Sequence, residues 1–269
     1  AFVADDSSGL QIIDVSNPAS PSLTATYDTS GAAYGVTLSA DGDTAFVADY
    51  SDGLDIIDVS NPASPSLTGT YNTSGNAEDV ALSADGNTAF VADRAHGLDI
   101  IDVSNHASPT LIGNLDTSSN AYKLKLSADG QTAFVADGGS GLQIIDIAEL
   151  FANGDASVAT KASIIGNYYN SGYNAYGITL SADGQTAFVV VNNNGLDIIN
   201  ISDPANPTLT GNYNTSGFAF DVTLSADGQT AFVADGDHGL DIIDVSNPAS
   251  PSLTGNYATS SKALDVTLS

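Results

Sequence analysis

The chain has 269 residues, with 32 Asp and Glu against 5 Lys and Arg, and it contains no Cys, Met or Trp. The absence of Cys excludes a disulfide framework, a thiolate metal site, an iron–sulfur cluster and a cysteine nucleophile. A net charge of −27 argues against nucleic acid as a partner, because such binders neutralise phosphates with Lys and Arg. No apolar run reaches the roughly 18 to 20 residues of a membrane span. We therefore predict a soluble globule without membrane insertion.

An internal repeat dominates the sequence. Ala-Phe-Val recurs with its Phe at positions 2, 46, 90, 134, 188 and 232, in steps of 44 residues except one step of 54. Each unit holds four short β-type runs between turn residues; in the second unit they cover 45–49, 54–59, 66–71 and 77–83. Four antiparallel strands in about 44 residues are typical of a propeller blade. We predict an all-β, six-bladed β-propeller of four-stranded antiparallel blades over residues 1–269, with units starting near 1, 45, 89, 133, 187 and 231.

The two ends of the chain complement each other. The chain opens on an Ala-Phe-Val strand, and residues 263–269 match the run that precedes this strand in the other units. We expect this C-terminal segment to complete the N-terminal blade and close the ring. The alternative is that the segment pairs with the open blade of another copy, which would build a filament by strand donation.

The motif Gly-Leu-Asp-Ile-Ile-Asp-Val-Ser-Asn-Pro at 53–62, continued to 71, resembles the LVIVD-repeat family of bacterial and archaeal surface proteins, and the resemblance covers all six units. The Val-Ile-Val core of that family reads Asp-Ile-Ile here, or Gln-Ile-Ile at 11–13 and 143–145. The resemblance implies a propeller on secreted or envelope-attached proteins. It brings no general catalytic residues to carry over to this sequence.

Positions that repeat unchanged are interpreted as scaffold. An Asp ends the Ile-Ile run of each unit at 14, 58, 102, 146 and 244, with Asn200 in the fifth unit. We predict that these side chains cap the following turn through backbone N–H groups. The Ser-Ala-Asp-Gly turns at 39–42, 83–86, 127–130, 181–184 and 225–228 receive the same interpretation.

Variation between the units concentrates in the loop after Ala-Phe-Val and at the start of the innermost strand. These two places lie on the same side of an up-and-down blade, so we expect one binding face there, with drift of solvent loops as the alternative. Arg94, His96 and Lys123 would form a basic patch suited to a carboxylate or sulfate. The predicted face comprises Tyr34, Tyr50, Asp52, Glu78, Asp79, Arg94, His96, Tyr122, Lys123, Tyr176, Asn193, Phe220, Asp221, Asp237, His238 and Asp265.

The step of 54 residues reflects an insertion over about 148–162. Residues 148–152 are predicted to form one helical turn, and 153–155 a short acidic turn. The insertion joins two outer strands, so it should emerge opposite the binding face, either as a docking element or as a tolerated insertion. Candidate glycosylation sites are the Asn-X-Ser triplets headed by Asn72, Asn200 and Asn214.

Asp235, Asp237 and Asp241 place carboxylates along one turn, and calcium prefers such oxygen ligands. The segment lacks the third acidic position and the bidentate Glu of an EF-hand loop. Ca²⁺ is therefore the one cofactor considered, and otherwise none is expected.

These observations favour a non-catalytic extracellular or cell-surface module that binds a protein or a glycan, or that assembles with copies of itself. The alternative from another class is a carbohydrate-active extracellular enzyme that uses carboxylates such as Asp79, Asp221 and Asp265 at the channel mouth. The separation of those carboxylates decides the chemistry and does not follow from the sequence.

Overall fold

The computed structural model describes residues 1–150, 162–170 and 172–268. Within these residues the chain forms two compact units, called unit 1 (residues 1–121) and unit 2 (122–150 with 162–268). The chain is an all-β propeller with six blades. In the part of the chain that is described, we find no helix long and apolar enough to cross a membrane.

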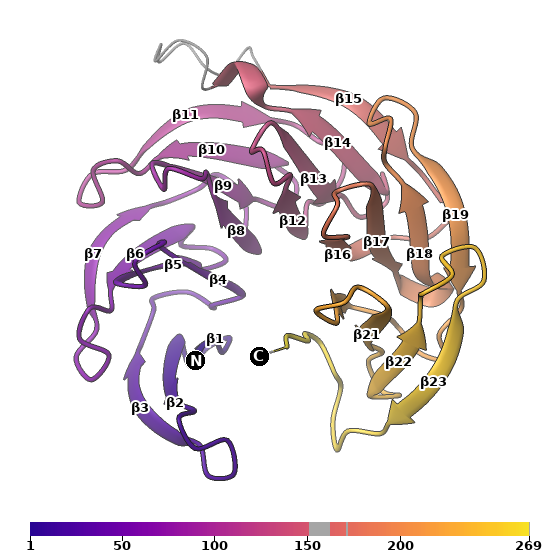
Figure 1. The fold of residues 1–269 in the computed structure, drawn as a ribbon. Coiled ribbons are helices and arrows are strands. Elements are labelled where there is room, and N and C mark those ends of the chain that lie inside the picture. Colours follow the sequence, from indigo (N-terminus) through magenta and orange to yellow (C-terminus); the bar gives the residue numbers. More distant parts are fainter. Residues whose placement is uncertain (151–161, 171, 269) are drawn as a thin grey trace. The chain divides into compact units, whose positions relative to one another are not determined.

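Unit 1 contains the first three blades (Figure 1). Each later blade runs from its innermost to its outermost strand in chain order, and neighbouring strands are antiparallel. The strands are β1 (Phe2–Ala4), β2 (Leu10–Asp14) and β3 (Ser22–Tyr27); β4 (Gly35–Leu38), β5 (Thr44–Ala48), β6 (Leu54–Asp58) and β7 (Ser66–Tyr71); and β8 (Asp79–Leu82), β9 (Thr88–Ala92), β10 (Leu98–Asp102) and β11 (Thr110–Leu115).

Unit 2 contains the fourth, fifth and sixth blades, which have the same strand order. Its strands are β12 (Lys123–Leu126), β13 (Thr132–Ala136), β14 (Leu142–Asp146) and β15 (Ser163–Tyr168); β16 (Ala175–Leu180), β17 (Thr186–Val191), β18 (Gly195–Asn200) and β19 (Thr208–Tyr213); and β20 (Asp221–Leu224), β21 (Thr230–Ala234), β22 (Leu240–Asp244) and β23 (Ser252–Tyr257). Two 3-10 turns accompany them, η1 (Ala148–Leu150) and η3 (Asn192–Asn194).

The core lies between successive blades. Strands such as β5 and β9 bury consecutive residues rather than alternate ones, because each sheet is covered on both faces. Phe46 and Ile56 of the second blade share one buried cluster with Val80, Val91 and Ile101 of the third. Corresponding clusters join the first blade to the second, the fourth to the fifth, and the fifth to the sixth.

The predicted scaffold role of the recurring Asp residues is confirmed. Asp58 Oδ1 accepts a hydrogen bond from the Ser60 N–H at 2.9 Å, which fixes the turn after β6. The Ser-Ala-Asp-Gly turns are also held by their side chains, since Thr44 N–H donates to Ser39 Oγ at 2.9 Å. The same cap recurs at Asp14, Asp102, Asp146, Asp244 and Asn200.

The closing strand is not seen. The first sheet has three strands, and among the described residues β1 pairs only with β2, while residues 264–268 form no strand. The C-terminal segment is held inside unit 2 instead, where Val266 N–H donates to Asp221 Oδ2 at 3.4 Å. Ring closure and the filament alternative both stay predictions.

The insertion is described only at its start. The predicted helical turn is present as η1, which spans Ala148–Leu150 and buries Leu150. The remainder of the insertion, with the acidic turn expected at 153–155, lies outside the described residues.

Candidate functional site

A backbone bridge that recurs from repeat to repeat brings the two variable segments together. The loop after the second strand of a blade forms an antiparallel bridge with the residue before the next innermost strand, as between Tyr50 and Ala77 or between Arg94 and Ala121. A buried Asp holds the same region. Asp93 Oδ1 accepts from Thr73 Oγ1, and its Oδ2 accepts from Gly75 N–H, both at 2.7 Å. The starts of the innermost strands are therefore fixed by the scaffold.

Four side chains of unit 1 form what we call the arginine cluster: Tyr34, Tyr50, Glu78 and Arg94. The Tyr34 and Tyr50 rings lie 5.1 Å apart. The Arg94 guanidinium lies over the Tyr50 ring, with Cζ 5.5 Å from its centroid, and also donates to the Tyr50 hydroxyl. Arg94 Nε pairs with Glu78 Oε1 at 3.2 Å. One cation is thus held by an aromatic face and a carboxylate together.

The backbone of the arginine cluster is strained. Tyr50 has φ of 44° and Arg94 has φ of 42°, in the left-handed region that large side chains seldom adopt. The corresponding residues of the fourth and sixth blades are Gly138 and Gly236, for which such angles carry no penalty. Two large side chains are therefore kept where glycine would relieve the backbone, which is a pattern found at functional sites.

Unit 2 presents what we call the aromatic cluster: Tyr122, Tyr176, Phe218 and Phe220. The Tyr122 and Tyr176 rings lie 4.6 Å apart, and Tyr176 lies 5.5 Å from Phe218 and 5.9 Å from Phe220. Phe218 and Phe220 lie 4.9 Å apart. All four are partly exposed, so their rings form a continuous aromatic surface.

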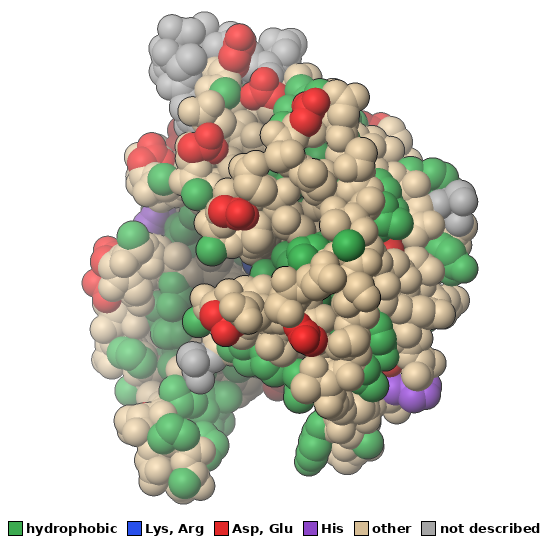
Figure 2. Space-filling model, turned by 45° about the vertical axis from the view of Figure 1, so that its right-hand side comes forward, with side chains coloured by type: hydrophobic (Ala, Val, Ile, Leu, Met, Phe, Trp, Pro, Cys, Tyr) green, Lys and Arg blue, Asp and Glu red, His purple; other side chains and the backbone are tan. Residues whose placement is uncertain are grey.

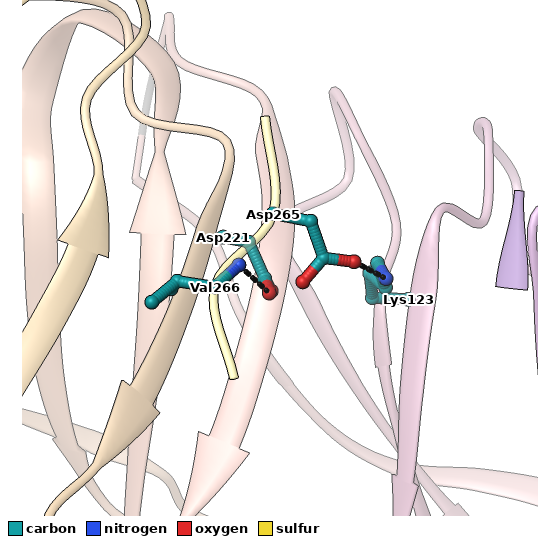
Figure 3. Close-up of polar contacts among 4 residues, drawn as sticks. All are labelled: Lys123, Asp221, Asp265 and Val266. Atoms are coloured by element: carbon teal, nitrogen blue, oxygen red, sulfur yellow. Dashed lines mark hydrogen bonds and ion pairs between the residues drawn. The ribbon is translucent and has the colours of Figure 1, made fainter. Parts of the chain in front are cut away.

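Directly after these rings in sequence come Lys123 and Asp221, which meet Asp265 of the C-terminal segment (Figure 3). Lys123 Nζ lies 3.4 Å from Asp265 Oδ2. Asp221 is buried and forms a hydrogen bond with the Asp265 carboxyl group. We call Asp221 and Asp265 the acid pair.

The acid pair is electrostatically uneven. Burial, the like negative charge of Asp265 and their hydrogen bond raise the pKa of Asp221 to about 7, against the lowering effect of Lys123. Desolvation by the nearby protein disfavours ionisation of Asp265, although its side chain is 60% exposed, but Lys123 and the hydrogen bond from Asp221 outweigh this effect and lower the pKa of Asp265. One carboxyl therefore holds a proton near neutral pH while the other is ionised. On the face of the molecule in Figure 2, red carboxylates are scattered with almost no blue.

The other predicted face residues differ in their contacts and exposure. Asp237 is exposed and lies 3.9 Å from Lys262 Nζ. Asp79 packs its backbone against Gly35, where an added Cβ would lie 2.9 Å from the Asp79 Cα. Asp52, His96, Asn193 and His238 are loop residues with partly or fully exposed side chains. The expected basic patch is neutralised locally, because Arg94 and Lys123 each have a carboxylate partner.

The residues considered for calcium have separate partners. Asp235 Oδ2 accepts from Gly217 N–H at 2.8 Å, and Asp241 Oδ1 accepts from Asn256 Nδ2 at 2.7 Å. Within the described ranges, no group of three or more His, Asp or Glu side chains is arranged to hold a metal ion. Asn72, Asn200 and Asn214, which head the glycosylation triplets, are exposed.

Sequence reasoning missed Phe218 and the buried Asp residues that end the Ala-Phe-Val-Ala-Asp runs. Phe218 stands where other repeats have Ala32 or Asn76, so a comparison of the repeats at that position would have found it. The Asp residues recur together with a Thr-Ser-Gly turn, and that joint recurrence was the available signal. Their role is to hold the turn that places the clusters.

Comparisons with known proteins agree with this architecture. The LVIVD repeat model matches residues 1–29, 30–73, 74–117, 124–153, 177–215 and 216–259, whereas a search of curated proteins found no match. Similar solved structures include a Lactobacillus plantarum protein (18% identity, TM-score 0.80, 98% of this chain and 82% of that one). Another is the periplasmic gluconolactonase of Pseudomonas aeruginosa (17%, 0.71, 91% and 74%).

A third similar structure is the Cps50 (Swd1) β-propeller domain of Myceliophteria thermophila (15% identity, TM-score 0.66, 86% of this chain and 74% of that one). At such identities these structures show a shared fold and no shared activity. The repeat model, in contrast, covers most of the sequence. The chain belongs to the LVIVD-repeat family.

Proposed function

We propose that this chain is a non-catalytic, extracellular or cell-surface recognition module that binds a protein or glycan ligand through the arginine cluster and the aromatic cluster. The observation that supports this most is the grouping of the residues that differ between repeats. Tyr34, Tyr50, Glu78 and Arg94 touch one another in unit 1, and aromatic residues from the same columns touch in unit 2. Exposed aromatic rings on a rigid scaffold supply contact area at a low cost in conformational entropy.

The strained backbone of Tyr50 and Arg94 also supports recognition. Selection for stability alone favours glycine at a left-handed position. A side chain kept there against that preference indicates a use for the side chain itself.

Ligand binding mapped onto these residues tests the proposal. The full chain would be screened on glycan and extracellular-protein arrays, and each hit would be titrated by isothermal calorimetry. Tyr50→Leu and Tyr176→Leu should weaken a genuine ligand by about tenfold, which is the size of a hot-spot contact. Tyr257→Leu, at an exposed tyrosine of the outer strand β23, is the matched control and should leave affinity unchanged. Equal affinity for all variants would refute the assignment.

One observation favours a second candidate, an acid–base hydrolase acting on a sugar-derived substrate. Asp221 keeps a proton near neutral pH beside an ionised Asp265 and a lysine, which are groups suited to general acid–base catalysis. A similar structure is a gluconolactonase. The hydrogen bond between the two carboxyls, however, places them closer than the roughly 5 to 9.5 Å separation used by glycosidases.

Turnover decides between the two candidates. The enzyme candidate predicts lactone hydrolysis by the wild type that falls by about a hundredfold or more in Asp221→Asn. Asp227→Asn, in an exposed turn, is the control. The recognition proposal predicts no turnover that depends on Asp221.

A further inference from the structure

One face of the first blade is exposed, whereas the equivalent face of later blades is buried. Val3 is 40% exposed and Val15 is 47% exposed. The equivalent residues of the second blade, Val47 and Val59, are at most 1% exposed, because they pack against the first blade. We call Val3, Val15 and the turn at 16–20 the first-blade face. It is an apolar surface of the kind that this chain otherwise covers with a neighbouring blade.

The sixth blade is uncovered on its opposite face. Phe232 and Ile242 are half-buried. Their equivalents in the fifth blade, Phe188 and Ile198, are at most 3% exposed, because they pack against the sixth blade. We call Phe232, Ile242 and Gly255 of β23 the sixth-blade face. In residue type it matches the faces that are buried between other blades.

A turn of the following blade packs against the outermost strand at the residue equivalent to Gly255. A Cβ added to Gly211 would lie 2.2 Å from the Pro248 carbonyl oxygen, and the same close approach recurs between the second and third blades and between the fourth and fifth. At Gly255, no atom of the described residues lies within 4 Å of an added Cβ. The sixth-blade face therefore has open space for a turn, and Pro18 of the first-blade face is the equivalent of Pro248.

Residues 264–268 enter the position of a further innermost strand. Ala263 exchanges two backbone hydrogen bonds with Gly236, at 3.0 and 3.1 Å, as Ala77 does with Tyr50. Ala77 leads into β8, which is the innermost strand of the next blade. In the described chain, residues 264–268 form no strand, and the first sheet has three strands in place of four. Each copy therefore has a segment outside any sheet and a sheet edge, at β1, that can accept such a segment.

We propose that the sixth-blade face binds the first-blade face of a second copy of this chain, whose first sheet takes up residues 264–268 as its innermost strand. The contact continues the packing found between successive blades, and a second copy supplies the same residue types that cover the equivalent face elsewhere in the chain. Because the two faces differ, each added copy presents a new sixth-blade face and the assembly stays open-ended. The contact is separate from the proposed function, since neither face contains a residue of the arginine cluster or the aromatic cluster.

The dependence of molar mass on concentration tests the proposal. The chain of residues 1–269 would be examined by sedimentation equilibrium at about 0.15 M and about 1 M NaCl. We expect the weight-average mass to exceed that of one chain and to rise with protein concentration. Because a net charge of −27 makes the copies repel one another, the rise should be larger at the higher salt concentration. The mass of one chain under all conditions would overturn the proposal.

Two variants each block one face. Gly255→Leu fills the open space on the sixth-blade face, and Val15→Asp places a charge in the first-blade face. Each should weaken self-association by at least about thirtyfold, which is the size of a hot-spot contact. Leu253→Phe is the matched control on β23, because Leu253 is 45% exposed and its equivalents that do have a following blade, Leu67 and Leu209, are 45% and 47% exposed. Unchanged association in both variants would contradict the assignment, and if one variant fails to fold in a urea titration, the other decides.

A mixture of the two variants tests the head-to-tail geometry. Gly255→Leu keeps the first-blade face and Val15→Asp keeps the sixth-blade face, so the mixture should form a complex of two chains that does not grow further. Absence of this complex would overturn the proposal. Undiminished self-association of Val15→Asp alone would also overturn it, because sixth-blade faces would then pair with each other.

A pair of cysteines distinguishes a second copy from the same chain. Val36 lies opposite Val47 in the second blade, and the same register places Val266 opposite Val3 of the other copy. The chain has no Cys, so a double variant with Val3→Cys and Val266→Cys carries these two thiols alone. Mild oxidation should link two and more chains through disulfides that a reductant breaks. A disulfide within one chain, or no disulfide at all, would contradict the assignment to a second copy.

Discussion

The arginine cluster of unit 1 and the aromatic cluster of unit 2 use the same columns of the repeat with different results. In unit 1 the left-handed loop position carries Asp6, Tyr50 and Arg94, and Arg94 supplies a cation to the cluster. In unit 2 the equivalent positions are Gly138, Asn192 and Gly236, and the rings contact one another. The comparison teaches that the scaffold fixes where a side chain can stand, while the loop residue decides which side chain stands there.

The largest expected effect is on the pH dependence of stability, and it comes from buried Asp residues that belong to neither cluster. Burial raises the pKa of Asp55 and of Asp99 to about 6 in unit 1, and the pKa of Asp221 to about 7 in unit 2. A raised pKa in the folded state adds stability at low pH, and this stability is lost as pH rises through the folded pKa. We expect the free energy of unfolding to fall between about pH 4 and 7, by on the order of 3 kcal/mol for Asp99 alone.

Urea unfolding at a series of pH values measures this loss. Asp99→Asn should flatten the profile in unit 1, and Asp221→Asn should flatten its upper end. The chain contains a natural precedent, because Gln143 occupies the column of Asp99 in the fourth blade and stays neutral. Unchanged profiles in both variants would show that the slope comes from general charge repulsion instead.

The second effect tests whether a close backbone contact between neighbouring blades, present in both units, is needed for stability. A Cβ added to Gly35 would lie 2.9 Å from the Asp79 Cα, and one added to Gly177 would lie 2.8 Å from the Asp221 Cα. Because backbone cannot move aside easily, Gly35→Ala and Gly177→Ala should each lower the free energy of unfolding by about 2 kcal/mol. Gly255→Ala, with open space around the added Cβ, is the control. Neutral results at both sites would mean that the blades can separate there.

The fold was predictable because every repeat carries the same signals. Turn residues at fixed spacing, consecutive apolar residues in Ala-Phe-Val and the recurring capping Asp each point to one structure, and the caps at Asp58 and its equivalents confirm it. The three-stranded first sheet was not anticipated. Sequence identity shows that residues 263–269 can form an inner strand, but it does not decide between β1 and the contacts to Asp221 and Lys123.

From the sequence, the candidate site was predictable only as a set of equivalent positions that vary between the repeats. Variation between units indicated Tyr34, Tyr50, Arg94 and Tyr176, but not which of them touch, because side-chain direction at a loop depends on backbone angles such as the φ of 42° at Arg94. The hydrogen bond between Asp221 and Asp265 joins residues 44 positions apart. Distances of that kind do not follow from spacing in a sequence.

The third effect contrasts the Arg94–Glu78 ion pair of unit 1 with the Lys123–Asp265 ion pair of unit 2. Arg94→Met removes the ion pair with Glu78, which is only 12% exposed, and should cost about 1 to 2 kcal/mol. Lys123→Met removes the partner of Asp265, which is 60% exposed, and should cost less than about 1 kcal/mol. Lys123→Met should also raise the pKa of Asp221 above its value of about 7, because the lysine lowers it. Carboxyl NMR titration measures that shift, and a fall in the pKa would contradict the geometry of the acid pair.

The smallest effect isolates the strained backbone. Both Arg94→Ala and Arg94→Gly lose the contacts with Tyr50 and Glu78, but only glycine relieves the φ of 42°. The glycine variant should therefore be the more stable of the two by up to about 1 kcal/mol. At His96, two residues further on and without a positive φ, the order should reverse, because glycine there only adds freedom to the unfolded chain. Chemical unfolding of the four variants compares the two positions. The same order at both would remove the argument that Arg94 is kept against a backbone preference, and the arginine cluster would then be ordinary surface packing.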